Sequence, residues 1–236
     1  MINSRIWMEF WNLNWKTGVI ACAIFVWCIP GNVATAAAVK RIPTDKKVVA
    51  LTFDDGPSAK FTPIILETLR ENHAKATFFV IGSRVERLPE VLAEELREHD
   101  EIANHSFKHQ IMTSLSEQRI CDELSNTQLA IKEATGSEQP LMFRPPRGRI
   151  NKKILQVAEL HHYTVVMWSI DSGDWANPGV HRIVKTVLSQ VRSGDIILFH
   201  DQGGSRRQTV TALKQIIPVL RQRGYEFVTI SDLIST

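Results

Sequence analysis

The stretch "LTFDDGPS", residues 51–58, ends an apolar run on two adjacent acids, Asp54 and Asp55, and continues into Gly56 and Pro57. The run before the acids, residues 48–53, is short and apolar, as expected for a buried strand. Two adjacent carboxylates repel one another, and a turn needs only one of them. Either the turn is acidic by chance, or the two acids have different roles at one site.

The rest of the chain alternates short apolar runs with longer amphipathic stretches, which is the pattern of an α/β protein. Apolar runs predict strands at residues 48–53, 76–82, 101–104, 141–143, 163–170, 195–200 and 225–230. Helical spacing, caps and breakers predict helices at residues 62–72, 88–99, 116–136, 151–162, 181–191 and 209–224. This order implies a mainly parallel sheet of about seven strands with helices outside it. A closed or nearly closed β/α barrel fits better than an open sheet, which stays an alternative.

Length and composition are those of one globular domain. The 236 residues are 44% hydrophobic and 22% charged, which excludes a disordered chain. The net charge is only +3, and no run of Lys or Arg is of the kind that binds phosphates, so we expect no nucleic-acid partner. We expect the domain to be a monomer.

The first 38 residues differ from the rest and have the order of a secretory signal peptide. Residues 18–29 are apolar and uncharged, two basic residues precede them, and the small residues 34–38 offer cleavage sites. The apolar segment is shorter than the roughly 20 residues that a spanning helix needs. An uncleaved membrane anchor stays an alternative, favoured by three tryptophans at helical spacing, Trp7, Trp11 and Trp15. Either way, we expect residues 39–236 to form a catalytic domain that is secreted, attached to the cell wall or otherwise extracytoplasmic.

Unusual polar residues follow five of the predicted strands. They are Asp54-Asp55, "NHSFKH" (104–109), "RPPRG" (144–148), "DSGDW" (171–175) and His200-Asp201. In parallel β/α folds the carboxyl ends of the strands build the active site. One such cluster can arise by chance, but five on one rim indicate an active site.

Two of these polar residues, His105 and His109, are four positions apart. On a helical turn this spacing puts both imidazoles on one face, where they can share a metal ion. Two histidines and one carboxylate, with positions left for water and substrate, form a catalytic zinc-type site. Either Asp54 or Asp55 can supply the carboxylate, which leaves its neighbour free to act as a base.

In combination, the motifs "TFDDGPS", "HSFKH", "RPPRG", "DSGDW" and "LFHD" resemble those of the polysaccharide deacetylase family, the NodB homology domain of carbohydrate esterase family 4. They occur in the family's order from about residue 48 to the last helix, and the combination is specific where each motif alone is weak. The resemblance implies a distorted β/α barrel and a metal-dependent hydrolase that removes N-acetyl groups from amino sugars. The implied metal is a divalent ion, zinc before cobalt or manganese.

The resemblance also implies roles for individual residues. Four residues match catalytic positions of the family: the base Asp54, its orienting partner Arg144, the general acid His200 and the acid that tunes it, Asp174. The residues that match the metal ligands are Asp55, His105 and His109. Those that match the lining of the acetyl pocket are Trp168 and Leu198.

One position departs from the family's usual pattern. An aromatic residue usually precedes the glycine of the third motif, and this chain has Arg147 there. Its backbone N–H remains available to stabilise an oxyanion. Its side chain brings a cation to the edge of the sugar site, where it would meet an anionic sugar such as N-acetylmuramic acid with its lactyl carboxylate. A solvent-facing Arg147 is the alternative.

The expected function is removal of N-acetyl groups from a cell-wall polysaccharide, either peptidoglycan or a chitin-like oligosaccharide. An O-acetyl esterase acting on xylan or another acetylated glycan would use the same site. The third hypothesis is a glycan-binding wall protein without catalytic activity. It is disfavoured because all the matched catalytic positions are filled.

Overall fold

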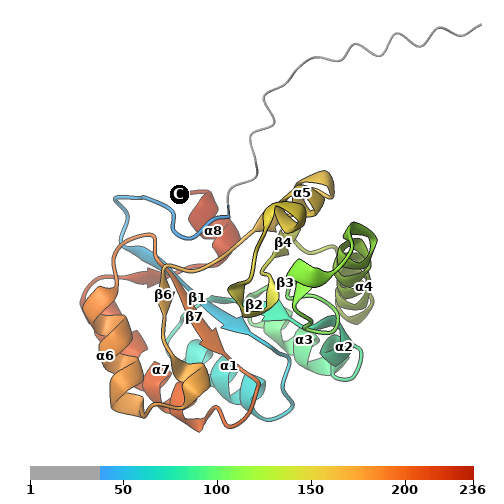
Figure 1. Cartoon of the computed structure of the whole chain (residues 1–236). Coiled ribbons are helices and arrows are strands. Elements are labelled where there is room, and N and C mark those ends of the chain that lie inside the picture. The colour runs from blue at the N-terminus through green and yellow to red at the C-terminus, as the bar shows by residue number, and fades with distance from the viewer. Residues whose placement is uncertain (1–37) are drawn as a thin grey trace, which may run out of the picture. The chain divides into compact units, whose positions relative to one another are not determined.

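A single curled sheet organises residues 38–236, the part of the chain that the computed structural model describes (Figure 1). Its strands are β1 (Val48–Asp54), β2 (Ala76–Val80), β3 (Glu101–Asn104), β4 (Met142–Phe143), β5 (Thr164–Val165), β6 (Ile170–Asp171), β7 (Ile196–His200) and β8 (Glu226–Phe227). Seven of them follow the order β5-β4-β3-β2-β1-β7-β6, and β8 pairs with the start of β1. All pairings between these strands are parallel. The predicted α/β fold, a distorted barrel of about seven mainly parallel strands, is confirmed.

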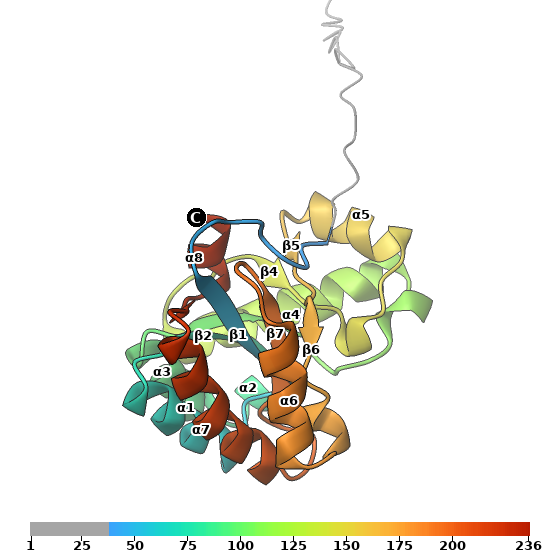
Figure 2. The ribbon, with the colours of Figure 1, turned by 90° about the vertical axis from the view of Figure 1, so that its left-hand side faces the viewer.

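The connection between β5 and β6 shows why the sheet curls. A single strand predicted at residues 163–170 is wrong: β5 pairs with β4 at one edge of the sheet, and β6 pairs with β7 at the other. Only residues 166–169 join them, and an extended chain advances about 3.3–3.6 Å per residue, so the join spans less than about 20 Å. A flat sheet of seven strands spaced about 4.8 Å apart would be about 29 Å wide. The two edges must therefore approach one another, and Figure 2 shows β1, β7 and β6 side by side in the curled sheet.

Helices lie around the outside of the sheet (Figures 1 and 2). They are α1 (Phe61–Glu71), α2 (Gly82–Val85), α3 (Pro89–Arg97), α4 (Glu117–Thr135), α5 (Lys152–Leu160), α6 (Val180–Gln190), α7 (Arg207–Gln222) and α8 (Ile230–Ile234). The six predicted helices are confirmed within a few residues, and Gly136 ends α4 at a φ of 68°. The short helix α2 was not predicted. The strand predicted at 225–230 shortens to β8 because Thr229 caps α8, accepting the N–H of Asp232 at 3.1 Å.

The packing of β1 explains why its sequence dominates the fold. All seven of its residues are buried, and it pairs with β2 on one side and β7 on the other. Phe53 stacks on both Phe78 and Phe199, with ring centroids 5.0 and 5.8 Å apart, and so joins the three strands through one core cluster. The same register sets Asp54 beside His200 at the carboxyl edge of the sheet.

The predicted signal peptide or membrane anchor, residues 1–38, lies outside the described residues except for its last position. None of the helices within residues 38–236 combines the length and the apolar character needed to cross a membrane.

Candidate active site

The polar strand ends meet around one cleft of about 460 Å³. The residues that line it are Asp54, Asp55, His105, His109, Arg147, Gly148, Trp168, Asp171, Trp175, Leu198 and His200. Eight of the ten residues singled out in the sequence are in this lining. The other two, Arg144 and Asp174, have no exposed surface and contact lining residues from behind. The structure therefore brings all ten together.

The two adjacent acids point to different partners. Asp54 is the last residue of β1, and its Oδ1 accepts a hydrogen bond from Nη1 of Arg144 at 2.6 Å. Asp55 has a left-handed backbone with a φ of 77°, which turns its carboxylate toward the histidines. Its Oδ1 lies 3.1 Å from Nε2 of His109 and 3.6 Å from Nε2 of His105. The two acids of the first motif thus have different nearest partners, Arg144 for Asp54 and His109 for Asp55.

Asp55, His105 and His109 form a candidate metal centre, with one ligand atom from each lying within 4.8 Å of the others. Nδ1 of His105 donates to the backbone carbonyl of Arg144 at 2.7 Å, which leaves Nε2 as the free nitrogen. Zinc binds imidazole nitrogen and carboxylate oxygen at about 2.0–2.2 Å, so tetrahedral ligands lie about 3.4 Å apart. The observed separations of 3.1 and 3.6 Å fit such an ion.

The same contacts set the charge of Asp55. Burial alone would raise the pKa of this carboxyl, but the hydrogen bonds and charges of His105 and His109 hold the pKa well below its ordinary value. A carboxylate that stays ionised next to two imidazoles is suited to bind a divalent cation.

The histidines lie on a loop after β3, so the helical turn considered for them is wrong. Ser106 and His109 have left-handed backbones, with φ of 68° and 54°. Oε2 of Glu123, on α4, accepts the backbone N–H groups of both Phe107 and Lys108 at 2.8 Å and fixes the loop. The sequence did not identify Glu123, because it reads as one more acid on an amphipathic helix.

Arg144 is a fully buried cation that holds Asp54 in place. Besides Asp54, its guanidinium donates to Oγ1 of Thr52 at 2.9 Å and to the carbonyls of Val166 and Met167 at 3.2 and 3.1 Å. It also lies 3.9 Å from the ring centroid of Phe79. With one oxygen of Asp54 engaged in this way, the other, Oδ2, lies 3.7 Å from Nε2 of His105 and faces the candidate metal centre.

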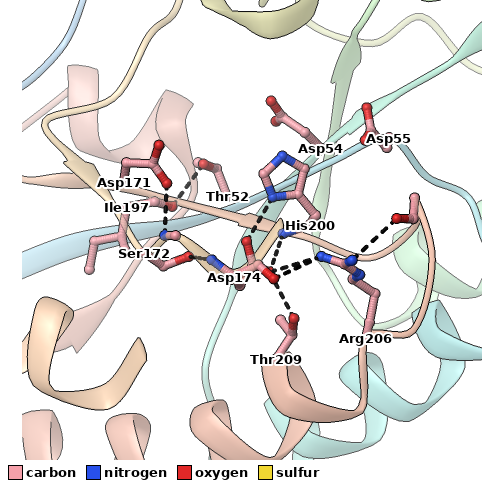
Figure 3. A network of polar contacts seen from close by, with 12 residues as sticks. Thr52, Asp54, Asp55, Asp171, Ser172, Asp174, Ile197, His200, Arg206 and Thr209 are labelled. Atoms are coloured by element: carbon pink, nitrogen blue, oxygen red, sulfur yellow. Dashed lines mark hydrogen bonds and ion pairs between the residues drawn. The ribbon is translucent and has the colours of Figure 1, made fainter. Parts of the chain in front are cut away.

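His200 is held by Asp174, as Figure 3 shows. Oδ1 of Asp174 accepts from Nδ1 of His200 at 2.8 Å, and Oδ2 accepts from the His200 backbone N–H at 2.9 Å and from Oγ1 of Thr209 at 2.8 Å. Nη1 of the buried Arg206 donates to the Asp174 carbonyl at 3.1 Å. Thr209 and Arg206 were not identified from the sequence, since nothing local distinguishes them from neighbouring residues.

The environment of His200 favours its charged form. Burial lowers the pKa of the imidazole, but the hydrogen bond and charge of Asp174, together with the charges of Asp54 and Asp55, raise the pKa to about 9. A protonated imidazole in the cleft can donate a proton to a leaving group.

The remaining walls of the cleft are apolar or aromatic. Trp168 packs so closely on Gly148 that a Cβ there would lie 2.5 Å from the Trp168 ring. Leu198 of β7 is buried beside them, while Trp175 is 59% exposed at the rim. Arg147 is exposed at the rim as well, so its side chain is accessible to a ligand and to solvent alike.

Polar residues and a candidate metal centre at the carboxyl edge of a distorted β/α barrel form a site that is suited to metal-assisted hydrolysis. The comparisons with known proteins agree and are more specific. Residues 41–166 match the family model described as polysaccharide deacetylase. The chain belongs to this family, as its motifs predicted, and is a deacetylase of polysaccharides.

Three relatives illustrate the similarity. A peptidoglycan-N-acetylglucosamine deacetylase from Bacillus cereus is 42% identical over 82% of this chain and 91% of its own length. A chitooligosaccharide deacetylase from a Bradyrhizobium species is 38% identical over 75% of this chain and 86% of its own. The crystal structure of the Bc1960 peptidoglycan N-acetylglucosamine deacetylase superposes with a TM-score of 0.80 and 34% identity, covering 83% of this chain and 92% of that one.

Proposed function

We propose that the chain is a metal-dependent N-deacetylase of peptidoglycan or a related acetylated wall polysaccharide. The observation that carries the proposal is the separation of Asp54 from Asp55. One carboxylate is held by Arg144, the other faces two imidazoles, and His200 lines the same cleft. This arrangement supplies a base, a cation site and an acid around one substrate.

The residues divide the hydrolysis of an acetamide between them. A divalent ion held by Asp55, His105 and His109 would act as a Lewis acid on the acetyl carbonyl and lower the pKa of water. Asp54, fixed by Arg144, accepts the proton of the attacking water. His200 donates a proton to the departing amine, because Asp174 keeps it charged near neutral pH.

The lining of the first cleft is suited to an acetyl group attached to a sugar. Trp168 and Leu198 supply an apolar surface for the methyl group, and the backbone N–H of Arg147 supplies a donor for the oxyanion. The exposed Arg147 side chain favours an anionic sugar over a neutral one. Relatives named for peptidoglycan and for chitooligosaccharide support both glycans as candidate substrates.

The metal and the location of the enzyme complete the proposal. Zinc suits the two imidazoles and one carboxylate, and cobalt and manganese are the alternatives. Residues 1–38 would export the domain to the cell wall or the medium, as a cleaved signal peptide or as a retained anchor, and the enzyme would act as a monomer.

The test is acetate release by the purified full-length chain from peptidoglycan, chitooligosaccharide and acetylxylan. Protein stripped of metal with a chelator is assayed alone and after addition of zinc, cobalt or manganese, and the Asp54→Asn variant is assayed in the same way. Metal-dependent release from an N-acetylated glycan that the variant lacks is the expected result. Release only from acetylxylan would replace the proposal with an O-acetyl esterase, and glycan binding without release would replace it with a binding protein.

A further inference from the structure

A second, cationic cleft adjoins the candidate active site. It has a volume of about 270 Å³ and meets the first cleft at Asp55 and His109, which line both. Its other lining residues are Ile81, Ser83, Arg84, Arg87, Lys108 and Gly203. Three of these are cations, and among the lining residues Asp55, already facing two histidines, is the one acid.

The three cations of this cleft lack partners of their own. Within residues 38–236, no carboxylate lies within 4.0 Å of Arg84, Arg87 or Lys108, and their side chains donate no hydrogen bond. Among the exposed cations of residues 38–236, Arg41, Arg70 and Lys132 pair with carboxylates and most others do not, so the distinctive feature of this cleft is that three unpaired cations line it together. Unpaired like charges on one wall repel one another and create a positive potential, which a bound anion relieves.

The segment that carries Arg84 and Arg87 is attached to the loop of the candidate metal centre. The N–H groups of Gly82 and Ser83, at the start of α2, donate to the carbonyls of Ser106 and Phe107 at 3.1 and 3.0 Å. The helix that carries Arg84 is therefore attached to the loop that carries the histidines. Backbone hydrogen bonds consequently set the position of α2 relative to the candidate metal centre.

Another segment that lines the cleft is also close to the candidate metal centre. Gly203, in the loop after β7, approaches so closely that a Cβ there would lie 3.2 Å from Oδ2 of Asp55. A ligand in the cationic cleft is thus next to the group being hydrolysed. Of the two clefts, Arg147 lines only the first, so a contact between Arg147 and a sugar would be separate from binding in the cationic cleft.

We propose that Arg84, Arg87 and Lys108 bind a carboxylate on the sugar next to the one that loses its acetyl group, which makes an anionic glycan the preferred substrate. The proposal rests on the proposed function and names the substrate class of that site. Guanidinium groups bind carboxylates with two parallel hydrogen bonds, and a lysine adds a third charge. Peptidoglycan strands freed of their stem peptides carry a lactyl carboxylate on every second sugar, whereas a chitin-like oligosaccharide is neutral.

The experiment compares the full-length chain with the triple variant Arg84→Gln, Arg87→Gln, Lys108→Gln. Three substrates of equal length are used: peptidoglycan strands freed of stem peptides and of phosphate, the same strands with their carboxylates reduced to alcohols, and chitooligosaccharide. Lys214→Gln, an exposed cation on α7 that lines neither cleft, is the matched control. Equilibrium binding of each glycan is measured beside turnover.

For the triple variant, kcat/KM on the carboxylate-bearing strands is expected to fall about 10-fold through KM, which corresponds to about 1.4 kcal/mol. Activity on the two neutral substrates should not change, and the wild-type preference for the charged strands should weaken as salt is raised. Lys214→Gln should behave as wild type on all three.

Two results would overturn the proposal. One is an equal effect of the triple variant on charged and reduced strands, and the other is a wild-type preference that survives carboxyl reduction. Binding separates this proposal from the proposed function. If no substrate is hydrolysed but the wild type still binds the charged strands about 10-fold more tightly than the triple variant, the cleft proposal stands and the deacetylase proposal falls.

Discussion

The carboxylate of Asp174 binds His200 twice, once at the ring and once at the backbone. Nδ1 of the ring and the backbone N–H donate to its two oxygens at 2.8 and 2.9 Å. Because Asp174 is fully buried and also accepts from Thr209, it cannot turn away from the ring. The pair therefore holds a charged imidazole at a fixed place in the cleft.

This pair predicts how activity and stability depend on pH. The pKa of His200 is about 9 in the folded protein against an ordinary 6.5, so its contribution to stability is complete below about pH 6.5 and is lost as pH rises through about 9. Deacetylation should fall over the same range as His200 loses its proton. In Asp174→Asn burial remains while the main raising interaction is removed, so the fall should move to lower pH.

Two measurements check this prediction: the pH profile of acetate release, and NMR titration of the His200 ring in metal-free protein. Asp232→Asn, at an exposed position on α8, is the control. An unchanged His200 pKa in Asp174→Asn would contradict the role of the pair.

Asp54→Asn should abolish most activity and should also destabilise the fold. Removing a general base costs typically about 10²–10⁴-fold in rate. The asparagine keeps an oxygen for Arg144, but the buried guanidinium loses its counter-charge, and breaking a buried ion pair costs up to about 3–5 kcal/mol. Steady-state kinetics and urea unfolding separate the two effects, with the exposed Asp45→Asn as control. Retention of full activity by a folded Asp54→Asn protein would rule out Asp54 as the base.

Glu123→Ala should weaken metal binding without touching a ligand. The variant leaves the N–H groups of Phe107 and Lys108 without their acceptor, so the loop between the two histidines loses its anchor. Loss of a supporting contact of this kind costs about 10–100-fold in metal affinity. Glu123→Gln keeps an oxygen acceptor and should lose less.

Competition titration of zinc against a chelator measures this effect, with the exposed Glu133→Ala on the same helix as control. Equal zinc affinity in wild type and Glu123→Ala would show that the histidine loop does not depend on Glu123.

Gly56→Ala should destabilise the fold and lower activity together. A Cβ at Gly56 would lie 2.2 Å from Oδ2 of Asp201, whose carboxylate is held by Thr62. The backbone N–H of Asp201 donates to the carbonyl of Asp54 at 3.2 Å, so a displaced Asp201 disturbs the catalytic turn. Overpacking of this kind costs typically about 1–3 kcal/mol.

Thermal unfolding and acetate release should both show the Gly56→Ala defect. Gly136→Ala is the comparison, because a Cβ at Gly136 would have no atom within 4 Å, and any loss there comes from its positive φ of 68°, which Gly56 does not share. An unchanged melting temperature and unchanged activity in Gly56→Ala would contradict the role assigned to the contact with Asp201.

The sequence determined the order of the elements and the residues that gather at the site. Apolar periodicity is a local property of the chain, and it located six helices and most strands. The site was predictable because polar residues follow the strands and parallel strands end at one edge of a sheet. The five motifs then identified the family, since their combination and order are specific.

Only the tertiary structure decided which of those residues contact one another. Asp54 contacts Arg144 from 90 positions away, Thr209 reaches Asp174 across 35, and Glu123 holds the histidine loop across 16. The split of residues 163–170 between two sheet edges is likewise set by pairing with β4 and β7, and no local pattern encodes it. The cationic cleft also joins residues from four segments of the chain. Periodicity reports which face of an element is buried, whereas partners depend on how distant segments pack.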